Sequence, residues 1–352
     1  MSIFTLDRMR DLLSDSPKHA SRLDTILGLL VPTMGVQANI GYTLHWVLTR
    51  IRRAVTLGQV QVYFDRFGRY CGYVLWTQIA AEQEVEILKR GPLAWDGAEF
   101  STQGEVWVLE FKARYGETAS IIAEFCSNLP EECQSISYFH SRNGRWAAKR
   151  ASRRDALSYS RKLERGSDVA ESFLLSEWGP ESRHYALQAL NAGTDFGRIC
   201  RLLAQVPEYT RTPATLVTCR IRHAIRKRQY RLYMSDSATP IAFYTWARRE
   251  VSERERFAAK PHYAWDLDEW NDGRDLFLCD AVARNEGIGR LMQDLKTDWC
   301  PSEQLFVCER EAGIGANIRK FAWAKGKREL PDVQIGASSA LDLVSLLLER
   351  RE

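Results

Sequence analysis

His19 and Tyr209 are the two ring-bearing side chains whose sequence surroundings repeat along the chain. The stretch LLSDSPKH, from Leu12 to His19, and the stretch LLAQVPEY, from Leu202 to Tyr209, both place a Leu-Leu pair before a proline and a ring two residues after it. An imidazole titrates near neutral pH and can act as a general base, whereas a phenol titrates near pH 10 and cannot unless its pKa is strongly perturbed. His19 is therefore the candidate base, and a surface histidine at a helix C-terminus is the alternative.

Two carboxylates occupy matching places in buried strand patterns. Glu110 lies in EVWVLEF, and Asp280 lies in the later pattern DLFLCDAV. A carboxylate behind an imidazole orients the ring and stabilises its charged form. Glu110 and Asp280 are thus the candidate partners of a base.

The spacing between Glu110 and Asp280, here called the repeat offset, extends beyond the carboxylates. The strand patterns GYVLWTQ, from Gly72 to Gln78, and AFYTWAR, from Ala242 to Arg248, stand at this offset, and each contains a tryptophan that precedes an Ala-Trp-Asp tripeptide at the same distance. The offset also pairs Ile121 with Leu291 on a helix pattern, and it holds for about 60 residues without a gap. The repeat indicates two homologous domains.

Each buried strand pattern runs into a helix pattern through a loop that contains glycine. In RNEGIG, from Arg284 to Gly289, glycines would let the backbone approach a ligand, and the first helical N–H groups could bind a phosphate. The first domain has RYGETA at the same place. A simple strand-to-helix turn is the alternative interpretation. The candidate cofactor-binding residues are Arg284, Gly287, Gly289, Arg114 and Gly116.

The order of patterns in each domain is helix, long variable stretch, two strands with a turn, helix, strand, loop, helix and strand. This order is typical of a mixed α/β layer fold. We expect a first domain at 1–155, a charged and helical linker at 156–189, a second domain at 190–330, and a C-terminal helix within 331–352, at Ser338 to Arg350. The first domain also carries an insertion of about 20 residues after His19.

Composition excludes several classes of protein. The 352 residues suffice for two domains with cores of their own, and the formal charge of +4 is too small to indicate nucleic acid as a main partner. The most apolar region, Leu23 to Leu48, is interrupted by polar residues, so we expect no membrane span and a cytoplasmic protein. The cysteines and histidines show no metal-ligand spacing, so we expect no metal site.

The basic run RIRHAIRKRQYR, from Arg220 to Arg231, alternates with apolar residues at helical spacing. A solvated helix face is the default interpretation. The sharper hypothesis is that an acidic carrier protein docks on the face that carries Arg222, Arg226, Lys227 and Arg228.

Several of these motifs, in this order, resemble the RTX toxin-activating lysine acyltransferases. They are Ser16-Pro17-Lys18-His19, the strand pair in LGQVQVYFDRFGRYCGYVLW, the segment EQEVEIL, an acidic residue at the end of a strand, and YGE at the start of a helix. The resemblance covers most of residues 1–145 and recurs more weakly over about 195–325. It implies a Ser-x-x-His motif at Ser16 and His19 and a carboxylate position at Glu110 and Asp280. The family has aspartate and histidine where this chain has Glu110 and Tyr209, so each half departs from the pattern at one position.

The resemblance also implies a fold and a reaction. The fold is two tandem N-acetyltransferase-like units, each a twisted mixed or antiparallel sheet packed by helices, arranged as a pseudo-dimer within one chain. The reaction is transfer of a fatty acyl group from acyl carrier protein, whose phosphopantetheine carries it, to internal lysines of an RTX-type protoxin, with no tightly bound cofactor. Two alternatives stay open: a coenzyme A-dependent N-acetyltransferase that uses RNEGIG, and a non-catalytic relative that binds the carrier protein or the protoxin.

Overall fold

A computed structural model describes most of the chain, and the residues that it describes form two compact units. The first unit comprises Met1–Leu30 and Leu48–Gly193, and the second comprises Val31–Val47 and Thr194–Glu352. The described residues are 3–12, 21–35, 42–65, 67–91, 99–114, 116–142, 145–164, 180–250, 270, 273–298, 305–310, 316–321 and 338–339. The domain boundaries expected from the sequence remain predictions, and each unit is described by itself.

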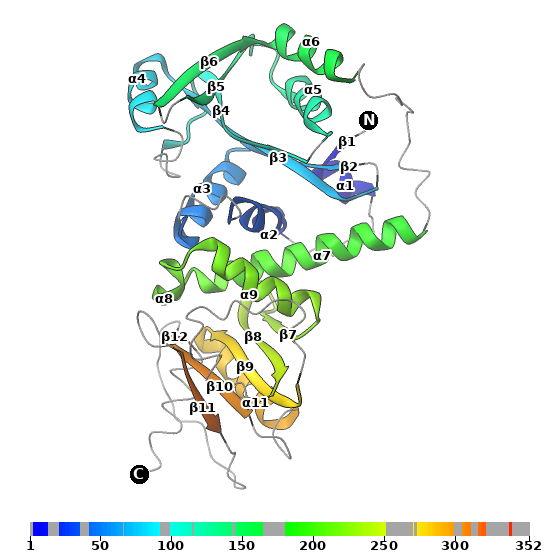
Figure 1. Cartoon of the computed structure of the whole chain (residues 1–352), viewed down its shortest axis with the longest axis vertical. Coiled ribbons are helices and arrows are strands. Elements are labelled where there is room, and N and C mark those ends of the chain that lie inside the picture. Colours follow the sequence, from blue (N-terminus) through cyan, green and yellow to red (C-terminus); the bar gives the residue numbers. More distant parts are fainter. Residues whose placement is uncertain are drawn as a thin grey trace. The chain divides into compact units, whose positions relative to one another are not determined.

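The first unit is built around a six-stranded sheet in the order β1-β2-β3-β4-β5-β6. Among these strands only the β4–β5 pair is parallel, because α5 connects the two strands as a crossover helix. Figure 1 shows α5 and α6 on one face of this sheet and α3 on the other. The elements are β1 (Ile3–Thr5), α1 (Leu6–Leu12), α2 (Arg22–Gly35), α3 (Leu44–Thr56), β2 (Val60–Asp65), β3 (Tyr70–Ile79), α4 (Ala81–Arg90), β4 (Glu105–Ala113), α5 (Thr118–Asn128), β5 (Ser135–Arg142), β6 (Arg145–Ser152), α6 (Arg153–Glu164) and α7 (Pro180–Leu203). Three of these helices, α2, α3 and α7, include residues of both units.

The second unit has a sheet in the order β7-β8-β9-β10-β11, with β12 added to β9. The β9–β10 pair is parallel and the others are antiparallel. Its core packs Leu291 and Leu295 of α11 against Tyr244, Leu276 and Leu278 of the sheet. The elements are α8 (Pro207–Thr210), α9 (Ala214–Arg226), β7 (Tyr230–Met234), β8 (Pro240–Arg249), β9 (Asp275–Ala283), α11 (Asn285–Asp298), β10 (Leu305–Arg310), β11 (Ala316–Phe321) and β12 (Ser338–Ser339).

Backbone hydrogen bonds recur in the two units at the repeat offset. The amide of Trp76 donates to the carbonyl of Gln59 at 3.0 Å, and that of Trp246 donates to the carbonyl of Gln229 at 3.1 Å. Further pairs with this offset are Gln59–Ala54 and Gln229–Ala224, Arg114–Cys71 and Arg284–Ile241, and Glu117–Arg114 and Gly287–Arg284. The two segments therefore share their turns as well as their strand order.

The structure differs from the expected order of elements in several places. Helix α3 precedes the first strand pair, β6 follows β5, and Ser338 begins a strand rather than the expected C-terminal helix. Ser338 and Ser339 pair with Ala283 and Val282 of β9. The rest of that expected helix, and the second tryptophan of each repeat, lie outside the described residues.

The turns of the two hairpins provide a matched test of backbone strain. Gly68 has a φ of 73° between β2 and β3, and Ala238 has a φ of 56° between β7 and β8. A side chain in this left-handed region costs about 1 kcal/mol or more, whereas glycine adopts it freely. We expect Gly68→Ala to lower the free energy of unfolding by about 1 kcal/mol and Ala238→Gly to leave it unchanged or raise it by less than about 1 kcal/mol.

Urea denaturation of the two variants beside the unaltered protein measures both changes. A destabilised Ala238→Gly protein together with an unaffected Gly68→Ala protein would contradict the shared turn geometry.

Candidate active site

Both candidate carboxylates lie directly after a β-bulge. Leu75 of β3 pairs with Glu110 of β4, while the next residue, Trp76, pairs with Val108, so Leu109 is the extra residue. In the second unit Thr245 pairs with Asp280 and Trp246 pairs with Leu278. The bulge therefore stands at the same place in both sheets, and bulges re-aim the side chains that follow them.

The bulge decides which face of the sheet carries the carboxylate. Val106 and Val108 pack on the side of α5, so strict alternation along β4 would place Glu110 there as well. One extra residue reverses the alternation: Phe111 returns to the α5 side, and Glu110 faces Arg50 of α3. In the second unit the carboxylate of Asp280 likewise faces Arg220 of α9.

The parallel partner strand ends its pairing just before each carboxylate. β4 pairs with β5 only over Val106–Val108, and β9 pairs with β10 only over Leu276–Leu278. Glu110 and Asp280 therefore lie beyond the parallel ladder. In the second unit β12 pairs with the end of β9 on this stretch.

Asp280 is enclosed by side chains that donate to it. Its Oδ1 atom accepts from the hydroxyl of Tyr209 at 2.7 Å and from Nη2 of Arg220 at 2.6 Å, and Oδ2 accepts from the hydroxyl of Thr245 at 3.4 Å. Only 1% of its side chain is exposed. Burial raises the pKa of this carboxyl, and the contacts with Arg220, Tyr209 and Thr245 act in the opposite direction. Asp280 is thus a satisfied, buried group.

Glu110 has a similar but more open environment. Nη2 of Arg50 lies 3.1 Å from Oε1, and the hydroxyl of Tyr73 donates to Oε2 at 2.8 Å. Burial, with the neighbouring Glu110 charge, raises the pKa of Tyr73 well above its ordinary value, so the phenol stays protonated and donates. Within the described residues Oε1 accepts no hydrogen bond of good geometry, and 9% of the Glu110 side chain is exposed.

The Tyr209–Asp280 contact shows that the repeated motif reaches the strand carboxylate in the second unit. Tyr209 ends the sequence LLAQVPEY, whose leucine pair lies at the end of α7, and its ring is buried. Ser16 and His19, the equivalent positions in the first unit, lie outside the described residues. The expected approach of His19 to Glu110 therefore stays a prediction.

Comparison with protein families gives a match over part of the chain. Residues 188–322, fewer than half of the chain, match the model of the RTX toxin acyltransferase family. This part of the chain is similar to the RTX toxin acyltransferase family. No curated protein matches the chain.

The residues that match the RTX toxin acyltransferase family include Tyr209, not His19. They contain both Tyr209 and Asp280, together with the Arg284 loop. The family is described as one of acyltransferases, which supports acyltransferase activity in general. Glu110 and His19 lie outside the match.

The glycine loop of the second unit is shaped by packing. A Cβ atom on Gly287 would lie 2.6 Å from the carbonyl oxygen of Ile241 and 2.8 Å from Cβ of Ala242, whereas a Cβ on Gly289 would meet nothing within 4 Å. Arg284 pairs with Glu286 at 3.5 Å. Gly287 thus lets α11 approach β8. A ligand-binding role for Arg284, Gly287 and Gly289 stays a prediction.

These two glycines give a second matched test. We expect Gly287→Ala to lower the free energy of unfolding by about 1–3 kcal/mol, because the added methyl group must push α11 away from the backbone of β8. Gly289→Ala should leave stability unchanged or raise it by less than about 1 kcal/mol, since alanine favours the helix and has room. Thermal unfolding of the variants measures both. Equal losses in the two proteins would remove the packing explanation.

The corresponding loop of the first unit carries a buried carboxylate. Glu117 is only 5% exposed and stands at the position that the repeat offset pairs with Gly287. Burial raises the pKa of Glu117, and Asp65 raises it further. Arg114 lies 3.9 Å from Asp65, and Gly116 has a φ of 89° with open space around it. The loop of the first unit thus has a buried acidic side chain where the second unit has Gly287.

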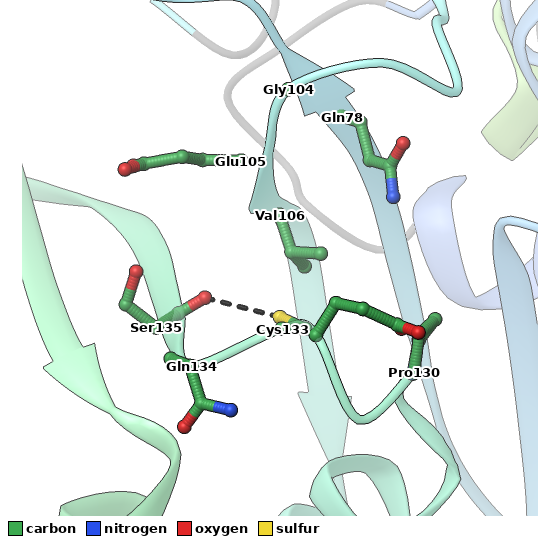
Figure 2. A pocket seen from close by; sticks show the side chains of 9 residues that line it. Gln78, Gly104, Glu105, Val106, Pro130, Cys133, Gln134 and Ser135 are labelled. Atoms are coloured by element: carbon green, nitrogen blue, oxygen red, sulfur yellow. Dashed lines mark hydrogen bonds between the residues drawn. The ribbon is translucent and has the colours of Figure 1, made fainter.

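A cavity of about 480 Å³ lies at the opposite ends of β4 and β5 from Glu110. Figure 2 shows its lining, where the thiol of Cys133 donates to the carbonyl of Ser135 at 3.2 Å. Gln78, Glu105 and Val106 also line it. None of the predicted site residues does, so this cavity is separate from the candidate active site.

The sequence interpretation missed the two arginines under the carboxylates. The prediction of a solvated helix face is wrong for Arg220, because its side chain is 9% exposed and pairs with Asp280. The exposed residues of that run include Arg226, Lys227 and Arg228. Arg50 and Arg220 are themselves related by the repeat offset, so the repeat could have identified the pair.

Among the described residues, no helix is long and apolar enough to cross a membrane. The same residues contain no group of three His, Cys, Asp or Glu side chains that could hold a metal ion.

Proposed function

We propose that this protein is a lysine acyltransferase that moves a fatty acyl group from acyl carrier protein to internal lysines of an RTX-type protoxin. The first unit would be catalytic, with His19 as general base and Glu110 as its partner. The observation that carries the proposal is the 2.7 Å contact between Tyr209 and Asp280 in the unit that matches the family. It supports an equivalent contact of His19 with Glu110.

The proposal treats the two units as copies of one N-acetyltransferase-like domain, fused as a pseudo-dimer. Support comes from the shared strand order, the bulge before each carboxylate, and the hydrogen bonds that recur at the repeat offset. An arginine on the preceding helix, Arg50 or Arg220, also pairs with the carboxylate in both units. Independent folds would not be expected to share all of these details.

The chemistry in the first unit needs an available base and an oriented partner. The lysine amine attacks the thioester carbon, a C–N bond forms as the C–S bond breaks, and the carrier thiolate leaves and is protonated. His19 would accept the amine proton, and the Oε1 atom of Glu110, which is buried beside Nη2 of Arg50 and accepts no hydrogen bond among the described residues, would accept one from the His19 imidazole. Tyr73 would hold the other oxygen of the same carboxylate.

The second unit lacks these conditions. Tyr209 occupies the position of the base, and its hydroxyl, together with Arg220 and Thr245, satisfies Asp280 in a fully buried site. A buried phenol that donates to a carboxylate does not accept a proton from an amine at neutral pH. We propose that this unit contributes binding or stability rather than catalysis.

The same enclosure favours one alternative function, a non-catalytic relative that binds a carrier protein or protoxin. If His19 does not reach Glu110, both units lack a base and this alternative stands. The coenzyme A-dependent alternative is less well supported, because Glu117 is buried beside the first glycine loop and Gly287 is needed for packing in the second.

Transfer of label from palmitoyl–acyl carrier protein tests the proposal. The purified chain is incubated with the loaded carrier and a lysine-bearing protoxin segment, and acylated lysines are located by mass spectrometry. We expect acyl groups on lysine ε-nitrogens with the carrier as donor and at most slow transfer from palmitoyl-coenzyme A. Binding of the carrier without any transfer would instead support the non-catalytic alternative.

Docking of the carrier should depend strongly on salt. The docking face of Arg222, Arg226, Lys227 and Arg228 lies at the end of α9 and just after it, and exposed charges are screened over about 10 Å at about 0.1 M salt. We expect binding of acyl carrier protein to weaken at least about tenfold when salt rises from about 50 mM to about 500 mM, and replacement of these residues by glutamine to flatten this dependence. Titration calorimetry or fluorescence anisotropy measures both. Binding that does not change with salt would place the docking face elsewhere.

A further inference from the structure

We infer that Arg50 is a positioning residue that holds Glu110 toward the reacting groups in the first unit. The inference rests on the proposed function, which assigns Glu110 to the base but gives no role to Arg50. Arg50 lies on α3, on the face of the sheet to which the bulge turns the carboxylate.

Burial of the Arg50–Glu110 pair restricts the orientation of the Glu110 carboxylate. The Arg50 side chain is 0% exposed, and its Nη2 atom lies 3.1 Å from Oε1 of Glu110. Removing a guanidinium from water is costly unless a carboxylate and further acceptors compensate it. Arg50 lies against one oxygen of the Glu110 carboxylate, and the hydroxyl of Tyr73 donates to the other. The carboxylate therefore has little freedom to rotate.

The second unit shows what an arginine at this position does to the bulge. Nη2 of Arg220 donates to Oδ1 of Asp280 at 2.6 Å and to the carbonyl of Cys279 at 3.0 Å. Cys279 is the bulge residue itself, whose backbone is displaced from the regular ladder. One guanidinium thus fixes the bulge and the side chain that follows it.

Comparison of the units separates positioning from a purely structural role. Both units keep the buried arginine, but only Asp280 has both oxygens occupied by hydrogen bonds from side chains of its unit. In the first unit the Oε1 atom next to Arg50 lacks such a bond among the described residues. Arg50 therefore holds a carboxylate that still has an acceptor site to offer.

A double-mutant cycle on the full chain tests this inference. The variants are Arg50→Gln, Glu110→Gln and the two combined, assayed for transfer from palmitoyl–acyl carrier protein to a lysine-bearing protoxin segment. We expect Arg50→Gln to lower kcat about tenfold to a hundredfold with little change in KM, because a carboxylate misplaced by about 1 Å loses this much and neither residue binds the substrates. In the Glu110→Gln background the same change should add no further loss.

Two further variants keep the result interpretable if Arg50→Gln folds poorly. Arg50→Lys retains the charge with a single donor group, so it should fold and recover part of kcat. Arg220→Lys is the matched control in the second unit and should change kcat less than about twofold. Circular dichroism of every variant checks folding.

The outcomes distinguish the inference from the function on which it rests. The positioning role would be overturned if Arg50→Gln lowered kcat by the same factor in the unaltered protein and in the Glu110→Gln protein. It would also be overturned if Arg50→Gln left kcat unchanged. Either result would leave Glu110 as the partner of the base. Full activity in Glu110→Gln would remove the proposed pair itself and the role of Arg50 with it.

Discussion

His19→Ala lowers the rate of acyl transfer by a factor of about 10² to 10⁴ if the first unit is catalytic, since this is the usual contribution of a general base. Stability should hardly change if, as the sequence predicts, His19 lies at a helix end and contributes little to a core. Single-turnover transfer from palmitoyl–acyl carrier protein measures the chemical step.

The matched control for this change is Tyr209→Phe, which removes the hydroxyl that donates to Asp280. We expect it to change transfer by less than about twofold while lowering stability by about 1–3 kcal/mol, because a buried carboxylate oxygen loses a donor. Wild-type transfer by the His19→Ala protein would leave the non-catalytic alternative as the better account.

Arg220→Met lowers the free energy of unfolding of the second unit by about 3–5 kcal/mol, because it leaves Asp280 buried without its cation. The size of the effect follows from burial: the side chains of Arg220 and Asp280 are 9% and 1% exposed. Urea unfolding at neutral pH, followed by circular dichroism, measures the loss.

The double change Arg220→Met with Asp280→Leu is the control for that experiment. An apolar pair of similar volume removes the uncompensated charge, so we expect it to recover most of the lost stability. A double variant as unstable as Arg220→Met alone would show that packing, and not the buried charge, accounts for the loss.

The sequence predicted the parts of the site that depend on local patterns and on the repeat. The repeat offset located Glu110 and Asp280, and alternation of apolar residues located the strands that carry them. It did not predict which face of the sheet the carboxylates take. That face depends on Leu109 and Cys279, which are apolar like their neighbours and give no sign of a bulge in the sequence.

Arg50 was missed for a different physical reason. It lies in α3, within the stretch that the sequence predicts to be long and variable, and an arginine among apolar residues on a helix is usually exposed. The tertiary contact with Glu110 contributes to making its burial favourable. The repeat held the missing information, since Arg50 and Arg220 share the offset, but local propensity pointed to solvent.

Because of the bulge at Leu109, the position of the Glu110 carboxylate depends on the number of residues in β4 as well as on their identity. Deleting this one residue would restore a regular ladder and, with no change in any other side chain, send Glu110 to the apolar side of the sheet, among the contacts of Ile121 and Phe125. The bulges in β4 and β9 therefore set the face on which Glu110 and Asp280 lie, and a one-residue deletion in either strand would move the carboxylate to the other face. In homologous chains we expect the number of residues between the tryptophan of β3 or β8 and the carboxylate of β4 or β9 to vary less than the identity of the carboxylate residue.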